Sequence, residues 1–211
     1  MAVSKSWPKS MTMPEVGFSC QTVSWWTEVF SPKECEDLKT QLLELPRTIK
    51  GYTMDTMDTG KIDTKWRNSK VAHLPYTDEY QWIYDRMMVA GSKINQESYR
   101  YKLTGTHDEI NFIVYNKGEH FNCWHLDKCP AGYWTGLSRK LNCIVQLSDP
   151  DTYEGGEFQV WNGEDDIPII TAPKDQGFML ACSTFTWHRA TPVTKGQRCT
   201  LVLHLSGPPF E

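Results

Sequence analysis

The residues with the clearest chemical potential lie between His120 and Asp127. His125 and Asp127 are two positions apart, so on a β-strand both side chains point to the same face of the sheet. A third ligand is available at His188, farther along the chain. Two imidazoles and one carboxylate on a rigid strand scaffold can hold a divalent metal ion from one side, and they leave its other coordination positions open. The spacing therefore predicts a metal site that is open to a co-substrate and O₂.

A carboxylate-binding site is predicted beside these ligands. A single His-x-Asp pattern is weak evidence, because a lone histidine on a strand is more often structural. Arg198, however, lies ten residues after His188 on the next predicted strand, and Thr200 shares its face. An arginine beside a hydroxyl can bind a carboxylate through two hydrogen bonds, and a buried arginine needs such an anionic partner. With Tyr115 on the predicted strand before His125, the set favours the facial triad of a non-haem Fe(II) oxygenase.

Two helices are predicted in the first half of the chain. Ser31, Pro32 and Glu34 form a capping box with proline in the first helical position, so a helix begins there and ends at the next proline. A second helix is expected from about Asp78, because apolar residues follow at helical spacing. These residues are Ile83, Met87, Ala90 and Ile94. Residues 50–70 are polar and contain glycine, which favours short strands joined by loops.

After residue 100 the pattern changes to short segments rich in β-branched and aromatic residues, separated by turn signals. The predicted strands cover residues 109–115, 121–127, 141–147, 156–161, 177–182, 185–188 and 199–205. Many short strands without helices between them favour a double-sheet antiparallel architecture such as a jelly roll. We predict a mainly β (α+β) protein with N-terminal helices packed on one sheet. Residues 1–24 are expected to be a lead-in and residues 25–211 one domain, with helical support over about 25–100 and a β core over about 101–206.

The composition excludes several classes of protein. The 211 residues include 22 basic and 26 acidic residues, a formal net charge of −4, whereas a non-specific nucleic-acid binder needs a cationic face. No apolar run approaches the length of a membrane span, and the first residues lack the apolar segment of a signal peptide. The seven cysteines include no Cys-x-x-Cys pair. This argues against a disulfide framework or a zinc ribbon and favours a reducing, cytoplasmic setting.

A set of motifs resembles the Fe(II)/2-oxoglutarate-dependent dioxygenases, in particular the prolyl 4-hydroxylase-like subgroup with its small bacterial and phage members. The site residues occur in the order typical of that family: Tyr115, His125, Asp127, His188, Arg198 and Thr200. The further similar stretches are Trp25 to Pro32, Arg139 to Asn142, Tyr153 to Phe158, Pro192 to Arg198, and Leu203 to Phe210. The resemblance covers most of residues 25–210, and the motifs together are highly specific.

This resemblance implies a fold and a ligand set. The fold is a double-stranded β-helix, the cupin-like form of the jelly roll. The implied iron ligands are His125, Asp127 and His188. The implied anchor for the distal carboxylate of 2-oxoglutarate is Arg198, helped by Thr200. The implied cofactors are Fe(II), 2-oxoglutarate and O₂, with ascorbate as an optional addition.

Two further co-substrate contacts are implied, and the family pattern is broken near one of them. Tyr115 matches a tyrosine that reaches 2-oxoglutarate in relatives, and Gln146 lies on the strand where relatives place another polar contact. Relatives often have an aromatic residue three positions before the first iron ligand, where this chain has Asn122. Tyr115 also lies ten rather than nine residues ahead of that ligand. A one-residue bulge near Glu119 and His120 accounts for both departures.

The resemblance implies a hydroxylase that converts 2-oxoglutarate to succinate and CO₂. The implied substrate is a prolyl residue in a peptide or protein, and a free amino acid or small metabolite is the first alternative. Nucleic-acid dealkylation is disfavoured, because the dealkylase family carries a second arginine where this chain has His204. A non-catalytic, metal-binding jelly roll is the other alternative. The presence of all three ligands together with Arg198 argues against it.

Two segments, residues 50–70 and 128–138, are expected to border the metal pocket and to select the substrate. The second segment follows Asp127 directly and combines aromatic residues with a proline and a glycine, which suit a lid. Its aromatic rings can stack on a prolyl ring, although packing on the outer wall of the barrel is the alternative. The predicted substrate contacts are Arg67, Tyr133, Trp134 and Arg139.

Overall fold

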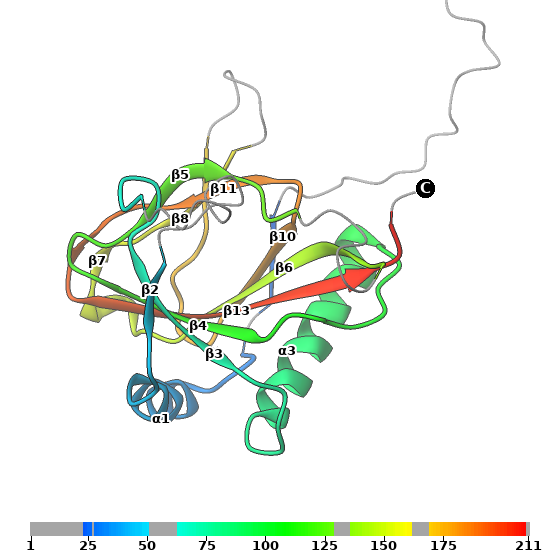
Figure 1. The fold of residues 1–211 in the computed structure, drawn as a ribbon, viewed down its shortest axis with the longest axis horizontal. Coiled ribbons are helices and arrows are strands. Elements are labelled where there is room, and N and C mark those ends of the chain that lie inside the picture. Colours follow the sequence, from blue (N-terminus) through cyan, green and yellow to red (C-terminus); the bar gives the residue numbers. More distant parts are fainter. Residues whose placement is uncertain (1–22, 27, 51–62, 129–135, 162–168, 210–211) are drawn as a thin grey trace, which may run out of the picture.

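The computed structural model describes residues 23–26, 28–50, 63–128, 136–161 and 169–209. Within these ranges strands predominate, and two antiparallel sheets form the body of the molecule (Figure 1). The helices are α1 (Pro32–Leu43) and α3 (Gln81–Ile94), and a π-helical turn at Asn95–Tyr99 extends the second. Among the described residues, no helix combines the length and the apolar character needed to cross a membrane.

The larger sheet has the strand order β1-β10-β6-β13-β4-β3-β2. Its strands are β1 (Val23–Trp26), β10 (Met179–Ser183), β6 (Ser138–Gln146), β13 (Gln197–Gly207), β4 (Ile110–Asn116), β3 (Ser69–Leu74) and β2 (Thr48–Lys50). The smaller sheet has the order β5-β11-β8-β9. Its strands are β5 (Phe121–His125), β11 (Trp187–Ala190), β8 (Phe158–Trp161) and β9 (Ile170–Thr171). A separate pair joins β12 (Val193–Lys195) to β7 (Glu154–Gly155), after a short 3₁₀ turn at Pro150–Thr152.

The strands predicted after residue 100 are found, with shifted ends. The predicted strand 185–188 begins only at Trp187, because the backbone N–H of Thr186 donates to Ser183 O and closes a turn before it. The bulge predicted near Glu119 and His120 is not found there, because Glu119 lies in a turn in which its backbone N–H donates to Asn116 O. The pairing of β5 with β11 instead shifts register between Phe121 and His125. At the other end of the chain, β1 begins at Val23, inside the predicted lead-in.

The two helices form where sequence periodicity places them. The N-cap Ser31 accepts a hydrogen bond from the Glu34 backbone N–H at 3.3 Å, and the Glu34 carboxylate accepts one from the Ser31 backbone N–H at 2.9 Å. This confirms the capping box. The second helix begins at Gln81, and the preceding residues form a turn in which the Thr77 carbonyl accepts from two backbone N–H groups.

Strand β13 divides the interior into an apolar side and a polar side. Its residues Cys199, Leu201 and Leu203 face α1 and α3 and belong to the main hydrophobic core. The alternate residues on β13 face the smaller sheet, because side chains on a strand alternate between its faces. Helix α3 approaches the large sheet closely at Gly91, where an added Cβ would lie 2.8 Å from both Cys143 Sγ and Leu205 Cδ1. The helices therefore support the large sheet from behind and leave its other face for a site.

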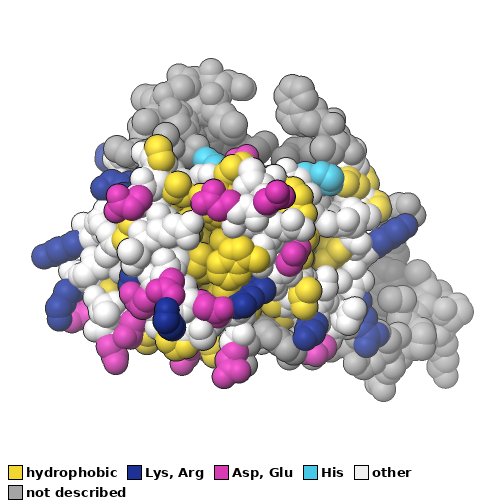
Figure 2. Space-filling model, turned by 90° about the horizontal axis from the view of Figure 1, so that it is seen from below, with side chains coloured by type: hydrophobic (Ala, Val, Ile, Leu, Met, Phe, Trp, Pro, Cys, Tyr) yellow, Lys and Arg dark blue, Asp and Glu magenta, His cyan; other side chains and the backbone are white. Residues whose placement is uncertain are grey.

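The helix-bearing side of the molecule shows no basic patch among the described residues. Lysine and arginine side chains are interspersed there with aspartate and glutamate around a central apolar area (Figure 2). Such a mixed surface does not present the cationic face that non-specific nucleic-acid binding requires.

Candidate active site

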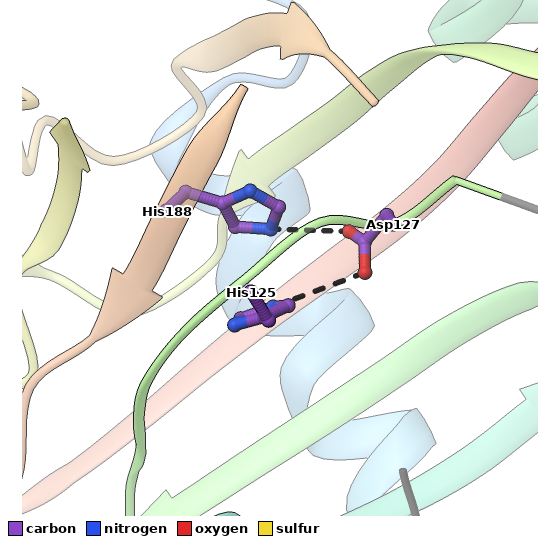
Figure 3. Close-up of side chains that lie close together, drawn as sticks. All are labelled: His125, Asp127 and His188. Atoms are coloured by element: carbon purple, nitrogen blue, oxygen red, sulfur yellow. Dashed lines mark hydrogen bonds and ion pairs between the residues drawn. The ribbon is translucent and has the colours of Figure 1, made fainter. Parts of the chain in front are cut away.

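The structure brings the three predicted metal ligands together on the smaller sheet (Figure 3). His125 ends β5, and His188 lies directly opposite it on β11. Asp127 follows β5, with its Oδ2 3.1 Å from His188 Nε2 and its Oδ1 3.8 Å from His125 Nε2. One ligand atom from each of the three residues lies within 4.8 Å of the other two. This spacing fits three ligands converging on a single ion.

Backbone carbonyls orient both imidazoles. His125 Nδ1 lies 2.9 Å from Cys123 O, and His188 Nδ1 lies 2.8 Å from Thr186 O. When each Nδ1–H donates to its carbonyl, the Nε2 lone pair is left to face the ion, as is usual for histidine ligands. The ring of Phe121 stacks on His125 with 3.6 Å between centroids, and the Phe158 ring lies along His188.

The protonation of His125 and Asp127 also suits a divalent cation. Burial, with a smaller contribution from neighbouring His188, lowers the pKa of the His125 imidazole to about 4. Burial alone would raise the pKa of the Asp127 carboxyl, but the surrounding histidines hold it well below its ordinary value. Asp127 is therefore ionised at neutral pH. The contact with Asp127 raises the pKa of His188 despite burial. Two imidazole nitrogens beside one carboxylate match the donor set of a non-haem Fe(II) centre.

A cavity of about 340 Å³ opens between the two sheets at these ligands. The β13 side chains that face away from the helices line it, together with residues of β4 and of the smaller sheet. Among the predicted site residues, the lining includes Tyr115, His125, Asp127, His188, Arg198 and Thr200. The predicted co-substrate contacts and metal ligands thus share one cavity, except for Gln146.

Arg198 is 2% exposed, and its described contacts are uncharged. Its Nε donates to Gln146 Oε1 at 3.1 Å, and its guanidinium carbon lies 5.4 Å from the centre of the Tyr115 ring on the neighbouring strand. Tyr153 also hydrogen-bonds to Arg198, and its hydroxyl accepts from Gln146 Nε2 at 2.6 Å. Gln146 therefore holds the arginine from behind and is not part of the cavity lining.

Residues of the Tyr-Glu-Gly-Gly stretch pack against this arginine. Gly156 has a φ of +58°, and a Cβ added there would lie 3.0 Å from Arg198 Cδ. Only glycine adopts this conformation at little cost, so the turn can lie directly against the arginine stem. Sequence reasoning missed the role of Tyr153, although the motif containing it was visible.

The predicted substrate contacts are only partly described. Arg67 lines the cavity, with its guanidinium carbon 4.7 Å from the centre of the Phe121 ring and its Nε donating to Ser69 Oγ at 2.9 Å. Arg139 also lines the cavity, and it forms a two-point ion pair with Asp108. The other predicted contacts, Tyr133 and Trp134, lie outside the described residues, as do most of the segments 50–70 and 128–138.

Comparison with known proteins agrees with this geometry. Residues 110–206 match the family described as the 2OG-Fe(II) oxygenase superfamily. Proteins of the superfamily use Fe(II), 2-oxoglutarate and O₂. The matched stretch runs from the start of β4 to the last residues of β13 and includes the three predicted ligands and Arg198.

The chain is also similar to curated PKHD-type hydroxylases. It is 31% identical over 97 residues to one from Shewanella sp. strain ANA-3, covering 44% of this chain and 41% of the relative. It is 32% identical over 90 residues to one from Rhizorhabdus wittichii, covering 41% of this chain and 38% of the relative. The chain thus matches about two fifths of the length of these relatives.

Solved structures of prolyl hydroxylases share the fold at low sequence identity. The prolyl-4-hydroxylase of Pseudomonas putida superposes with a TM-score of 0.63 at 13% identity, covering 89% of this chain and 94% of that one. The viral collagen prolyl hydroxylase of Paramecium bursaria Chlorella virus-1, in its 2-oxoglutarate complex, superposes with a TM-score of 0.61 at 15% identity. The match covers 90% of this chain and 99% of that one. A Trichoplax adhaerens prolyl hydroxylase, bound to a peptide fragment of hypoxia inducible factor, superposes with a TM-score of 0.68 at 13% identity. The match covers 87% of this chain and 83% of that one.

Proposed function

We propose that this protein is an Fe(II)- and 2-oxoglutarate-dependent hydroxylase. His125, Asp127 and His188 would hold the iron, and Arg198 with Thr200 would hold the distal carboxylate of 2-oxoglutarate. Tyr115 would contact the same co-substrate, because it lines the cavity directly opposite Arg198 on the neighbouring strand. We further propose that the two sheets are those of a double-stranded β-helix, which the prolyl hydroxylase neighbours support.

The observation that carries the proposal is the environment of Arg198. The guanidinium is buried in the cavity of the metal triad, and its described contacts are an amide and two tyrosine side chains. A buried charge without a counter-ion is strongly destabilising, so this arginine calls for an anionic ligand. A dicarboxylate whose other end reaches the metal ion satisfies both requirements at once.

The residues of the chain bind and orient the reactants. When bound, Fe(II), 2-oxoglutarate and O₂ together supply the oxidation that yields succinate and CO₂ and places one oxygen atom on a C–H bond. Carbonyl oxygens of Cys123 and Thr186 fix the two imidazoles, and the ring of Phe121 stacks on His125. The fixed cavity walls keep the co-substrate and the C–H bond in reacting geometry.

The proposed substrate is a prolyl residue of a peptide or protein, and a free amino acid or small metabolite is the alternative. Three structural neighbours are prolyl hydroxylases, and one of them is bound to a peptide. Arg67 and Arg139 at the cavity can donate hydrogen bonds to peptide carbonyls.

The five cysteines of the described residues are free thiols, which supports a reducing compartment such as the cytoplasm.

A turnover assay tests this proposal. The protein is incubated with Fe(II), ascorbate and 2-oxoglutarate, with and without prolyl peptides or free amino acids. We expect succinate to form only when both iron and 2-oxoglutarate are present, and a peptide to gain the mass of one oxygen atom on a prolyl residue. Oxygen gained by a free amino acid alone would favour the metabolite alternative. A protein that binds neither Fe(II) nor 2-oxoglutarate would refute the proposal.

A further inference from the structure

A chain of polar contacts leads away from the proposed metal ligand Asp127. His204 Nε2 lies 3.6 Å from Asp127 Oδ2, and His204 Nδ1 lies 3.9 Å from Asp108 Oδ2. Asp108 in turn accepts two hydrogen bonds from the guanidinium of Arg139, one of them from Nε at 2.8 Å. His204 thus lies between two carboxylates, with one ring nitrogen facing each.

The ring of His204 is buried, and its hydrogen-bonding capacity is unused within the described residues. The residue is 5% exposed and lines the cavity, and neither ring nitrogen has a hydrogen-bond partner there. Its cross-strand neighbour on β6, Asn142, has a buried Oδ1 that also lacks a partner among the described residues. Buried polar atoms are seldom left unpaired. The unpaired Nε2 of His204 lies on the side of the ring that faces the carboxylate of the proposed metal ligand Asp127.

We infer that His204 is a positioning residue for Asp127, an inference that rests on the proposed metal site. His188 Nε2 is the nitrogen nearest to Asp127 Oδ2, and in a metal complex its lone pair would belong to the ion. His204 also approaches Oδ2, with its Nε2 3.6 Å away. The two atoms are 3.6 Å apart, so a small movement of the carboxylate on metal binding would bring Oδ2 within reach of a His204 N–H. That hydrogen bond would fix the rotation of the carboxylate about its Cβ–Cγ bond. The other oxygen of Asp127 then keeps a constant direction toward the ion.

The pair of Asp108 and Arg139 holds His204 in turn. Asp108 precedes β4 and Arg139 lies on β6, the two strands that flank β13, so the pair spans the strand that carries His204. The pair packs on the Nδ1 side of the ring, with Asp108 Oδ2 3.9 Å from Nδ1, and this packing keeps the Nε2 side of the ring toward Asp127. Partners behind a metal ligand typically contribute about 10–100-fold to metal affinity.

Metal binding by His204 variants tests the inference without depending on turnover. Apo protein is titrated with Co(II) by calorimetry, and the visible absorption of the Co(II) complex is recorded. His204→Leu removes both ring nitrogens at similar volume, and His204→Gln keeps one donor. His204→Asn also carries an amide, but its side chain is too short to reach Asp127. If the leucine variant does not fold, the Asn and Gln variants are compared with each other instead. His120→Leu is the matched control, because His120 does not line the cavity.

We expect His204→Leu and His204→Asn to weaken Co(II) binding roughly 10–100-fold, with a changed Co(II) spectrum. His204→Gln should restore affinity to within about threefold, and His120→Leu should match the unchanged protein. Equal affinity in all variants would overturn the inference. Equally weakened Co(II) binding in the Gln, Asn and Leu variants, together with a lower melting temperature in all three, would also overturn it, since that pattern indicates a packing role. Failure of the unchanged protein to bind Co(II) would instead refute the proposed metal site itself.

Discussion

At the scale of single residues, Arg198 is the side chain on which the co-substrate proposal depends. We predict that Arg198→Ala weakens 2-oxoglutarate binding to the Mn(II)-loaded protein at least roughly thirtyfold. Removing one partner of a desolvated charge pair costs about 2–5 kcal/mol. Arg198→Lys should also bind poorly, because an ammonium group cannot reproduce the two-point fork of a guanidinium. Calorimetric titration with 2-oxoglutarate measures both effects.

The control for this prediction is Arg86→Ala on α3, since Arg86 pairs with Glu34 on the surface at 2.8 Å and lies outside the cavity. Its affinity for 2-oxoglutarate should equal that of the unchanged protein. Mn(II) affinity should stay the same in Arg198→Ala, because no proposed metal ligand is altered. Retention of 2-oxoglutarate affinity within threefold in Arg198→Ala would contradict the assigned role.

At the scale of elements, the turn that precedes β8 is predicted to shape the co-substrate end of the cavity. Gly156→Ala places a Cβ 2.9 Å from Val193 Cγ2 and 3.0 Å from Arg198 Cδ at a φ of +58°. We expect a loss of about 1–2 kcal/mol in stability from the left-handed backbone, and weaker 2-oxoglutarate binding from displacement of the arginine. Thermal melting and calorimetry separate the two effects.

Gly118→Ala is a matched control for that substitution. Gly118 also has a positive φ, +84°, but an added Cβ there has no neighbour within 4 Å. The backbone strain is thus similar, whereas Arg198 is not touched. The control should lose stability and keep its affinity for 2-oxoglutarate. An equal loss of affinity in both variants would attribute the effect to general destabilisation.

Strand β13 is the element that joins core and site, and substitutions on its two faces should have different consequences. Leu203 is fully buried against the helices. Leu203→Ala should cost about 2–5 kcal/mol of unfolding free energy, because it leaves a cavity in the core. The folded fraction should bind Co(II) as tightly as the unchanged protein. Denaturant unfolding measured beside Co(II) titration tests this separation, and a metal defect in the folded variant would contradict it.

At the scale of the whole molecule, the ion pair of Asp108 and Arg139 connects segments that are far apart in the sequence and makes stability depend on pH. Burial alone would raise the pKa of the Asp108 carboxyl, but Arg139, with a smaller effect from His204, holds it below its ordinary value. A carboxyl whose folded pKa is lowered adds stability above its unfolded pKa. That stability is lost as the pH falls through the folded value, that is, below about pH 4.

Asp108→Asn should therefore melt at lower temperature than the unchanged protein at neutral pH. A difference of about 1–3 kcal/mol is expected for losing a hydrogen-bonded charged partner. The difference should begin to narrow below about pH 4, where Asp108 of the unfolded chain takes up a proton, and should vanish at lower pH, where the folded carboxyl is protonated too. Melting curves from pH 3 to pH 8 measure it. A difference that is constant over this whole range would show that the charge of Asp108 does not stabilise the fold.

Several features of this protein follow from the sequence alone, because they depend on local periodicity. The capping box at Ser31 and the apolar spacing after Ile83 predict the two helices. The two-residue period of a strand places His125 with Asp127 and Arg198 with Thr200, and the structure brings all four to one cavity. These features concern neighbours along the chain, whose relative directions are set by backbone geometry.

Other features are decided only by the tertiary structure. The pairing of Val23 with Cys182 places β1 at the edge of the large sheet. The sequence shows no periodicity there that predicts a strand, and the start of β1 falls inside the predicted lead-in. Likewise, β13 is flanked by β4 and β6, so that Asp108 and Arg139 meet His204 from opposite sides. Local periodicity sets the face on which a side chain lies. Its neighbours across the sheet depend on long-range strand pairing, which is stabilised only when the whole core is assembled.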